Sequence, residues 1–290
     1  MIGALSAALV LAVLATLPPP SSAVARPLED IRRRGVIELC AHPDALPFAK
    51  RRGPVRGLQV ELAERIARGL GVDLAVDWVV TRWQIRYADC DLVMDVIVDR
   101  EALAAAEPRL RVSRPYFRSG VVLAVPPEHA GRGLEALPRT LRVGVLIGSL
   151  AHRRLERAGF VTVPFGFEDE MMEAVAAGEI DAAAVTPITL GWFRHHRPDL
   201  DLAVLDPFAG DDELSWNLAV GMRRSDRFLR RAVDDILEDL LVSGELAALY
   251  ARYGIDFRPP HFRAPRRVGR RSDLGTRECV RLGYARACRR

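Results

Sequence analysis

The sequence predicts a mixed α/β protein with two lobes and a cleft between them. Apolar strands alternate with helices between residues 28 and 98, the same alternation returns after residue 141, and a later strand brings the chain back to the first unit. Strands and helices that alternate in this way build largely parallel sheets covered by helices. Ligands bind such folds at the carboxyl ends of the strands, so the site is expected there, between the lobes.

The first predicted unit contains two helices and three strands. Its long helix is indicated by apolar residues at positions 58, 62, 66 and 70, and by Gly71 where the helix should end. Its last strand is largely apolar, as in the middle of a parallel sheet. In chain order the predicted elements are a helix at 28–35, a strand at 36–40, a helix at 58–71 and strands at 72–80 and 91–98.

The second predicted unit repeats the pattern and then returns to the first. Ser149 follows a strand and a glycine-bearing turn, which is the position of a helix N-cap. A break near Ser243 and Gly244 divides the last helical stretch in two. The predicted elements are strands at 141–148, 161–166 and 181–187, helices at 149–159, 168–180 and 188–196, a returning strand at 216–222 and the helical stretch 225–254.

The amino-terminal end differs from this α/β body. Residues 4–17 are apolar and uncharged, and three prolines, two serines and Ala23-Val24-Ala25 follow. This order predicts a cleaved signal peptide and a periplasmic protein with no stable membrane insertion. A membrane anchor is the alternative, but the apolar run is shorter than the roughly 20 residues of a bilayer span. The expected divisions are a signal peptide at 1–25, lobe 1 at 26–124 plus 217–260, lobe 2 at 125–216 and a tail at 261–290.

Positive charge is concentrated in the tail. Residues 261–290 hold ten Arg against Asp273 and Glu278, a net charge of +8, whereas the whole chain carries +4 and the other 260 residues therefore carry −4. Such a tail is typical of a disordered, solvated segment, and contact with an acidic surface or a membrane is the alternative. Nucleic-acid binding is not expected of an exported chain.

Four cysteines, Cys40, Cys90, Cys279 and Cys288, can pair in three ways in an oxidising compartment. Their spacing fits no zinc pattern, so no metal is predicted. If Cys40 ends one strand and Cys90 begins a parallel neighbour, a rise of about 3.3 Å per residue separates them by more than the ~7 Å that a disulfide allows. A Cys40–Cys90 bridge is therefore not expected, whereas the other two cysteines could pair within the tail.

Several segments, taken in order, resemble the family 3 periplasmic solute-binding proteins, the amino-acid receptors of ABC importers. The resemblance covers roughly residues 31–258 and implies the type II periplasmic binding protein fold. The segments that carry it are VIELCAHPDALPF at 36–48, GLQVELAERIARGLG at 57–71, RPYFRSGVVLAV at 114–125, VGVLIGS at 143–149 and LSWNLAVGMRRSD at 214–226.

A narrower set of motifs resembles the binding-protein-like accessory proteins of pyrroloquinoline-quinone (PQQ) alcohol and methanol dehydrogenases. The motifs are C-A-x-P-x-x-L-P-F at 40–48, C-D-L-V-M at 90–94, R-P-Y-F-R-S at 114–119 and A-V-G-M-R-R-S-D at 219–226. This resemblance implies a non-catalytic protein that contacts a quinoprotein dehydrogenase or its cytochrome and has no cofactor of its own. An ABC-importer receptor for an amino acid or another small polar or anionic solute is the alternative.

The resemblance also implies where a small polar ligand would lie. Arg109 stands where receptors hold the ligand carboxylate with a guanidinium fork, and a solvated loop arginine is the alternative. Gly148 and Ser149 open a helix whose N–H groups either bind an anion or are simply capped. The other candidate ligand residues are His42, Asp95 and Thr186.

Compared with the amino-acid receptors that the chain resembles, the set of residues that would contact a zwitterionic amino acid is incomplete. Receptors hold the ammonium with an aspartate at the end of the strand that is here 181–187, but Thr186 stands there, and a hydroxyl cannot neutralise a buried ammonium. Ala45 and Leu58-Gln59 also replace the aromatic and acidic residues that the family usually has. These departures favour the accessory protein over the amino-acid receptor.

A partner surface is expected on lobe 1. Residues 81–89 fill the place of a full helix in the family, and nine residues without a clear period cannot supply three turns. Trp83 and Tyr87 are therefore expected to be partly exposed and to contact a partner. Arg114 and Arg118 are expected to face an acidic partner and to set the encounter rate and orientation.

No catalytic centre is predicted. The six histidines are scattered, and no Ser-His-Asp or Cys-His arrangement is visible. A lyase similar to cyclohexadienyl dehydratase is a second alternative because that enzyme uses the same fold, and it would need a carboxylate with a raised pKa in the cleft. Glu61 and Asp95 are the candidates for that role.

Overall fold

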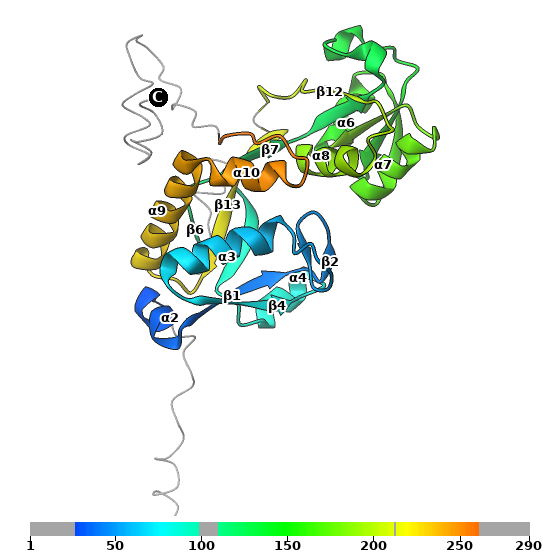
Figure 1. Cartoon of the computed structure of the whole chain (residues 1–290). Coiled ribbons are helices and arrows are strands. Elements are labelled where there is room, and N and C mark those ends of the chain that lie inside the picture. The colour runs from blue at the N-terminus through cyan, green and yellow to red at the C-terminus, as the bar shows by residue number, and fades with distance from the viewer. Residues whose placement is uncertain (1–26, 99–109, 212, 261–290) are drawn as a thin grey trace, which may run out of the picture.

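The computed structural model describes residues 27–98, 110–211 and 213–260, which form two α/β bodies (Figure 1). One is built on a six-stranded sheet and the other on a five-stranded sheet, and they are called lobe 1 and lobe 2 below. Figure 1 shows lobe 2, mainly green, apart from the blue and cyan elements of lobe 1. A mixed α/β fold with two sheets agrees with the sequence prediction.

In the lobe 1 sheet, the strands that come first in the chain run parallel to one another. Its strands are β1 (Val36–Ala41), β4 (Asp73–Trp78), β5 (Leu92–Val98), β6 (Leu110–Val112), β7 (Phe117–Gly120) and β13 (Ser215–Arg223). They lie in the order β4-β1-β5-β13-β6, with β7 also paired to β13. β1 runs parallel to β4 and β5. The late strand β13 returns to this sheet, as predicted, and pairs antiparallel with β5.

Helices cover this sheet and bury its core. They are α2 (Leu28–Arg34), α3 (Leu58–Leu70), α4 (Arg82–Tyr87), α9 (Arg227–Ser243) and α10 (Glu245–Ala251). Leu62 and Ile66 on α3 and Leu237 on α9 are almost fully buried in one cluster with the strands. Gly71 and Gly244 adopt left-handed backbone angles at the ends of α3 and α9, which is why those helices stop where the sequence predicted.

The lobe 2 sheet repeats the pattern. Its strands are β8 (Val122–Val125), β9 (Arg142–Leu146), β10 (Val161–Phe165), β11 (Ala182–Val185) and β12 (Ala203–Leu205), in the order β10-β9-β11-β8-β12. β9 lies parallel to β10 and β11. The helices are α6 (Leu150–Arg157), α7 (Glu168–Ala176) and α8 (Pro187–His196), with short 3₁₀ turns η2 (Pro127–His129) and η3 (Leu134–Ala136).

Helix α8 packs against both lobes. Leu190 and Phe193 lie in the lobe 2 core, whereas Ile188 on the same helix lies in the lobe 1 core. Gly191 makes the close approach possible, because a Cβ there would lie 2.8 Å from the carbonyl oxygen of Gly254. Figure 1 shows α8 next to α10, so this helix is the packed joint between the lobes.

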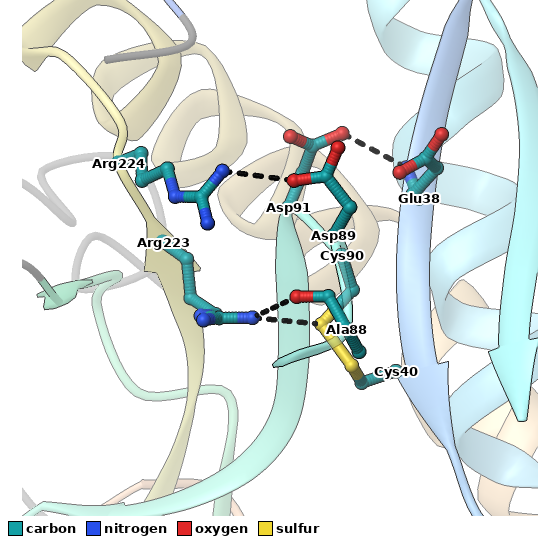
Figure 2. The surroundings of a disulfide bond; sticks show 8 residues. All are labelled: Glu38, Cys40, Ala88, Asp89, Cys90, Asp91, Arg223 and Arg224. Carbon is teal, nitrogen blue, oxygen red and sulfur yellow. Dashed lines mark hydrogen bonds and ion pairs between the residues drawn. A yellow bond between two sulfur atoms is a disulfide. The ribbon is translucent and has the colours of Figure 1, made fainter. Parts of the chain in front are cut away.

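A disulfide joins Cys40, near the end of β1, to Cys90, with a Cα–Cα distance of 5.4 Å. The prediction that these cysteines are too far apart was wrong. Cys90 precedes β5, and the chain bends around residues 88–91, so Cys90 turns back towards β1 instead of extending its own strand. Asp91 anchors the bend, because its N–H donates to the Glu38 carbonyl (2.8 Å) and its carboxylate accepts from the Glu38 N–H (3.0 Å) (Figure 2).

Two arginines of the returning strand hold the same bend. Arg223 donates to the Ala88 carbonyl at 2.7 Å and contacts Cys90 Sγ at 3.6 Å, and Arg224 pairs with Asp89 at 2.8 Å (Figure 2). The disulfide neighbourhood therefore ties three strands of lobe 1 together. Cys279 and Cys288 lie outside the described residues, as do the predicted signal peptide and the whole of the predicted tail at 261–290.

The segment 81–89 contains a short helix, α4. α4 has six residues and begins with a capping box, in which Thr81 and Gln84 bond each other's backbone. It is shorter than the three-turn helix that the sequence ruled out. A small two-stranded ladder of β2 (Asp44–Ala45) and β3 (Ala49–Lys50) precedes α3. In the ranges that the structure describes, no helix is both long and apolar enough to cross a bilayer.

Candidate functional site

The carboxyl ends of the lobe 2 parallel strands form one edge of that sheet. Ile147 follows β9 and Phe167 follows β10, and 70% and 67% of their surfaces are exposed. The Ile147 N–H donates to the Phe165 carbonyl at 3.0 Å, which keeps the two strand ends together. Exposed apolar side chains grouped at a strand edge are typical of a ligand-binding surface.

Glu168 is the carboxylate of this edge. It opens α7 and accepts hydrogen bonds from the Thr186 N–H (3.0 Å) and the Thr186 hydroxyl (2.8 Å). Thr186 follows β11 and caps α8, so both residues sit at helix starts, where partial positive charge favours a carboxylate. Burial raises the pKa of Glu168, although the hydrogen bonds from Thr189 and Thr186 oppose that shift.

Sequence reasoning missed Glu168 because it treated the acids at 168–170 only as the first turn of a helix. A signal for it was present. Glu168 follows β10 in the same way that Thr186 follows β11, and the carboxyl ends of parallel strands meet at one edge. Thr186 carries no negative charge itself, but it hydrogen-bonds to a glutamate, Glu168, that can carry one.

Gly148 and Ser149 lie at the same lobe 2 edge, between β9 and α6. Gly148 has a φ of 69°, the left-handed region that glycine tolerates without strain. Ser149 Oγ accepts from the His152 N–H at 3.0 Å, and the Gly148 N–H points to His152 Nδ1 at 3.4 Å. Side chains of α6 therefore cap this helix start themselves.

Asp95 occupies the corresponding place in lobe 1. Its carboxylate accepts from Gln59 Nε2 (2.8 Å) and from the Tyr116 hydroxyl (2.5 Å), and its own N–H donates to Tyr116 Oη (3.1 Å). Gln59 lies in the first turn of α3, after β1, so the cluster is on the carboxyl side of the lobe 1 sheet. Burial raises the pKa of Asp95, opposed by the bonds from Tyr116 and Gln59.

The backbone at Asp95 is unusual for a strand. Its φ is 57°, and the pairing of β5 with β13 shifts register between Ala219 and Gly221, opposite Asp95. One extra residue on β5 forms a β-bulge, a feature common beside functional sites because it redirects a side chain. Here it coincides with the half-buried carboxylate.

The remaining candidate ligand residues are placed as follows. His42 follows β1, and its Nδ1 accepts from the Asp44 N–H at 3.1 Å. Glu61 lies on α3, is bonded by the Tyr253 hydroxyl at 2.6 Å, and pairs with Arg252 of the segment after α10. Arg109 lies outside the described residues.

Arg114 and Arg118, which were expected to face an acidic partner, both make contacts within the chain. Arg114 is engaged within lobe 1, where its N–H donates to Asp234 (2.7 Å) and its guanidinium to Glu238 (3.2 Å). The Arg118 N–H donates to the Arg258 carbonyl, and burial and the nearby Arg258 lower the pKa of Arg118.

Helix α4 carries the two aromatic residues that were expected to contact a partner, Trp83 and Tyr87. Tyr87 is 90% exposed, and the side chain of Trp83 lies outside the description. Among the residues that the structure describes, no group of three or more His, Cys, Asp or Glu side chains is arranged to hold a metal ion.

The structure thus contains two carboxylate clusters, one in each lobe. Glu168 with Thr186 lies on the lobe 2 edge beside Ser149 and the exposed Phe167, and Asp95 lies on the carboxyl side of lobe 1. A half-buried carboxylate that already has a polar anchor can neutralise an ammonium or guanidinium group. This arrangement suits a small ligand with a positive charge and an apolar portion.

A sequence profile of the bacterial extracellular solute-binding proteins, family 3, matches residues 37–256. Among curated proteins, a membrane-bound lytic murein transglycosylase F of Pectobacterium atrosepticum is 27% identical over 267 residues, which are 87% of this chain and 53% of that protein. The chain therefore spans about half the length of that relative.

Solved structures show the same fold. An ancestral cationic amino acid solute-binding protein, AncCDT-1, superposes with a TM-score of 0.64 at 22% identity, covering 78% of this chain and 99% of the other. The L-cystine solute receptor of Neisseria gonorrhoeae gives 0.62 at 18% identity, with 79% and 97% covered. AbpA of Streptococcus pneumoniae, bound to L-arginine, gives 0.57 at 24% identity, with 78% and 97% covered.

Proposed function

The chain belongs to the bacterial extracellular solute-binding proteins of family 3, and we propose that it is a receptor for a small polar solute that carries a cationic group. The observation that carries the proposal is Glu168, a half-buried carboxylate fixed by Thr186 at the carboxyl edge of lobe 2. An extracellular family fits a secreted or periplasmic protein, and the signal peptide at 1–25 stays a prediction.

Glu168 changes the balance between the two functions that the sequence left open. The accessory-protein interpretation rested on the narrower set of motifs and on an incomplete shell for an amino acid, in which the absence of a counter-charge for an ammonium group at Thr186 was one departure. Glu168 offers that charge one hydrogen bond away from Thr186, so the receptor becomes the better-supported function. Asp95 adds a second carboxylate on lobe 1, and Phe167 and Ile147 offer an apolar surface for the rest of the solute.

The similar solved proteins support a cationic or zwitterionic solute. Their names include a cationic amino acid binding protein, an L-cystine receptor and a protein bound to L-arginine. We therefore propose a basic amino acid or a small amine as the first class to test, as cargo for an ABC importer.

Isothermal titration with L-arginine, L-lysine, putrescine, L-glutamate and succinate tests this proposal. We expect at least one cationic compound to bind and the two acids to bind more weakly or not at all. Glu168→Gln should weaken binding by about 30-fold or more, because removing one partner of a buried charge pair costs about 2 kcal/mol or more.

Glu170→Gln provides the matched control for that variant. Glu170 lies on the same helix, two residues away, and is exposed. We expect its replacement to leave affinity unchanged. Preference for the acids, or equal affinity in the Glu168→Gln and wild-type proteins, would contradict the proposal.

A second candidate function is favoured by the Cys40–Cys90 disulfide. This bridge joins the C-A-x-P and C-D-L-V-M motifs that resemble the accessory proteins of quinoprotein dehydrogenases, and the neighbouring Tyr87 is 90% exposed. In this alternative, α4 contacts the dehydrogenase or its cytochrome. Mixing the protein with a purified PQQ alcohol dehydrogenase should give a complex that Tyr87→Ala weakens, and the absence of a complex would count against it.

We propose no catalytic role. Asp95, a carboxylate whose pKa burial raises, has its two oxygens engaged by Tyr116 and Gln59, and Glu61 is engaged by Tyr253 and Arg252. One similar protein is described as a precursor of cyclohexadienyl dehydratase, and the curated relative is named as a transglycosylase. Turnover of prephenate or arogenate by the purified protein would contradict this part of the proposal.

A further inference from the structure

One hollow lies beside α8, and neither Glu168 nor Asp95 is among the residues that line it. This α8 cavity, of about 220 Å³, is bounded by the end of α8, the first turn of α3 and the residues after α10. The lining side chains that matter below are Glu61, Trp192, His195, His196, Arg252 and Tyr253. Because α8 carries lobe 2 core residues and α3 and α10 pack in the lobe 1 core, both lobes contribute walls.

Aromatic rings form one wall of the cavity. The His196 ring lies 3.8 Å from the Trp192 ring at an angle of 44°, and the Tyr253 ring lies 5.7 Å from Trp192. His196 Nδ1 donates to the Trp192 carbonyl at 3.0 Å, which fixes the histidine against the indole. A wall of fixed rings favours a flat ligand, because offset or tilted ring pairs add to the free energy of apolar burial.

Charged groups adjoin this wall, because the Tyr253 hydroxyl bonds Glu61. Glu61 is approached by two guanidinium groups, Arg252 and, at 3.7 Å, Arg65. Its other oxygen accepts from the Tyr253 hydroxyl, which itself accepts from the Gly57 N–H at 2.9 Å. Two arginines against one carboxylate leave this small network with a net positive charge. Of the two, Arg252 lines the cavity, and 56% of its side chain is exposed.

We propose that the α8 cavity binds a small aromatic anion, with its ring against Trp192 and its negative group on Arg252. The volume lies below the roughly 300–1,000 Å³ of pockets for drug-sized ligands, so the occupant should be about one ring in size. A guanidinium matches a carboxylate in geometry, and the rings supply stacking. Because the occupant touches both lobes, it stabilises the lobe arrangement in which the cavity is formed.

Benzoate is the probe, with benzamide as the uncharged ring and acetate as the anion without a ring. Isothermal titration of the full chain should show saturable benzoate binding and at least tenfold weaker binding of both comparison compounds. Arg252→Gln and Trp192→Leu should each weaken benzoate binding at least tenfold. Arg194→Gln, exposed on the same helix and outside the cavity lining, should not change it.

The absence of benzoate binding at millimolar concentration, or equal binding of benzoate and benzamide, would overturn the inference. Unchanged affinity in Arg252→Gln would do so as well, and this exposed position keeps the test valid even if Trp192→Leu fails to fold. Glu168→Gln separates this site from the proposed solute site, because it should leave benzoate binding intact. Loss of benzoate binding in Glu168→Gln would indicate that benzoate binds at the lobe 2 edge, and it would overturn the assignment of the site to the α8 cavity.

Discussion

Asp95 and Glu168 are the residues on which the chemistry depends. Asp95 was among the residues predicted from the sequence and Glu168 was not, and the partners that hold each of them lie far along the chain. Asp95 is held by Tyr116, 21 residues away, and Glu168 by Thr186, 18 residues away. Such contacts arise only when strands align. By contrast, the Ser149 cap involves His152, three residues on, and local pattern was enough to predict it.

The raised pKa of Glu168 gives solute binding a pH dependence. A cation binds the ionised carboxylate, and burial holds the proton on Glu168 at pH values where an ordinary glutamate has lost it. We therefore expect affinity for a cationic solute to fall on acidification, beginning above the usual glutamate range. Titrations at a series of pH values check this, and Glu168→Gln should show a flatter profile.

Asp95 should make the folded protein less stable as pH rises. At low pH the group is protonated in both states, but at higher pH the unfolded chain ionises first because burial raises the pKa only in the folded state. Asp95→Asn keeps an oxygen to accept from Tyr116 and tolerates the φ of 57°.

This variant should unfold at a higher temperature than the wild-type protein at pH 7, and the gain should shrink towards pH 3. Thermal unfolding at both pH values tests it. A gain that is equal or larger at pH 3 would show that ionisation of Asp95 is not the cause.

At the scale of elements, the pattern of apolar residues and glycines predicted the strands and helices well. It predicted the path of the chain near the strand ends less well. Helix α3 and the break at Gly244 follow from apolar spacing and glycine, which act within a few residues. The position of Cys90 depends on a bend before β5, and no local residue pattern indicates that the chain turns back there. The disulfide was missed for that reason.

The disulfide should contribute substantially to the stability of lobe 1. It closes a loop with a sequence separation of 50, for which the chain-entropy account gives roughly 4 kcal/mol. Cys40→Ala/Cys90→Ala should therefore shift the urea midpoint down. Added reductant should lower the wild-type midpoint and leave the variant unchanged, and a variant with the wild-type midpoint would contradict this.

Helix α8 should tolerate no side chain at Gly191. A Cβ there would lie 2.8 Å from the Gly254 carbonyl oxygen and 2.9 Å from Ile255 Cα, so the helix or the chain after α10 must move. We expect Gly191→Ala to cost about 1–3 kcal/mol of unfolding free energy. Gly210→Ala is the control, since a Cβ at that position meets nothing within 4 Å.

At the scale of the whole molecule, the two-sheet plan was predictable and the relation between the lobes was not. Alternating strands and helices in each half, with a returning strand, predicted two α/β bodies. That α8 would place Ile188 in one core and Leu190 in the other has no local signature, because both residues are simply apolar. The same helix carries the α8 cavity, so the joint is where a second ligand would act on lobe arrangement.

The proposed function depends on Glu168, which we propose provides the negative charge for a cationic solute between the lobes. The most direct test is a crystal structure of the protein with its tightest-binding amine or basic amino acid. We predict a solute nitrogen within hydrogen-bonding distance of a Glu168 oxygen, with Thr186 still bonded to that carboxylate. A solute whose nitrogen lies elsewhere, or whose own carboxylate occupies that position, would contradict the claim.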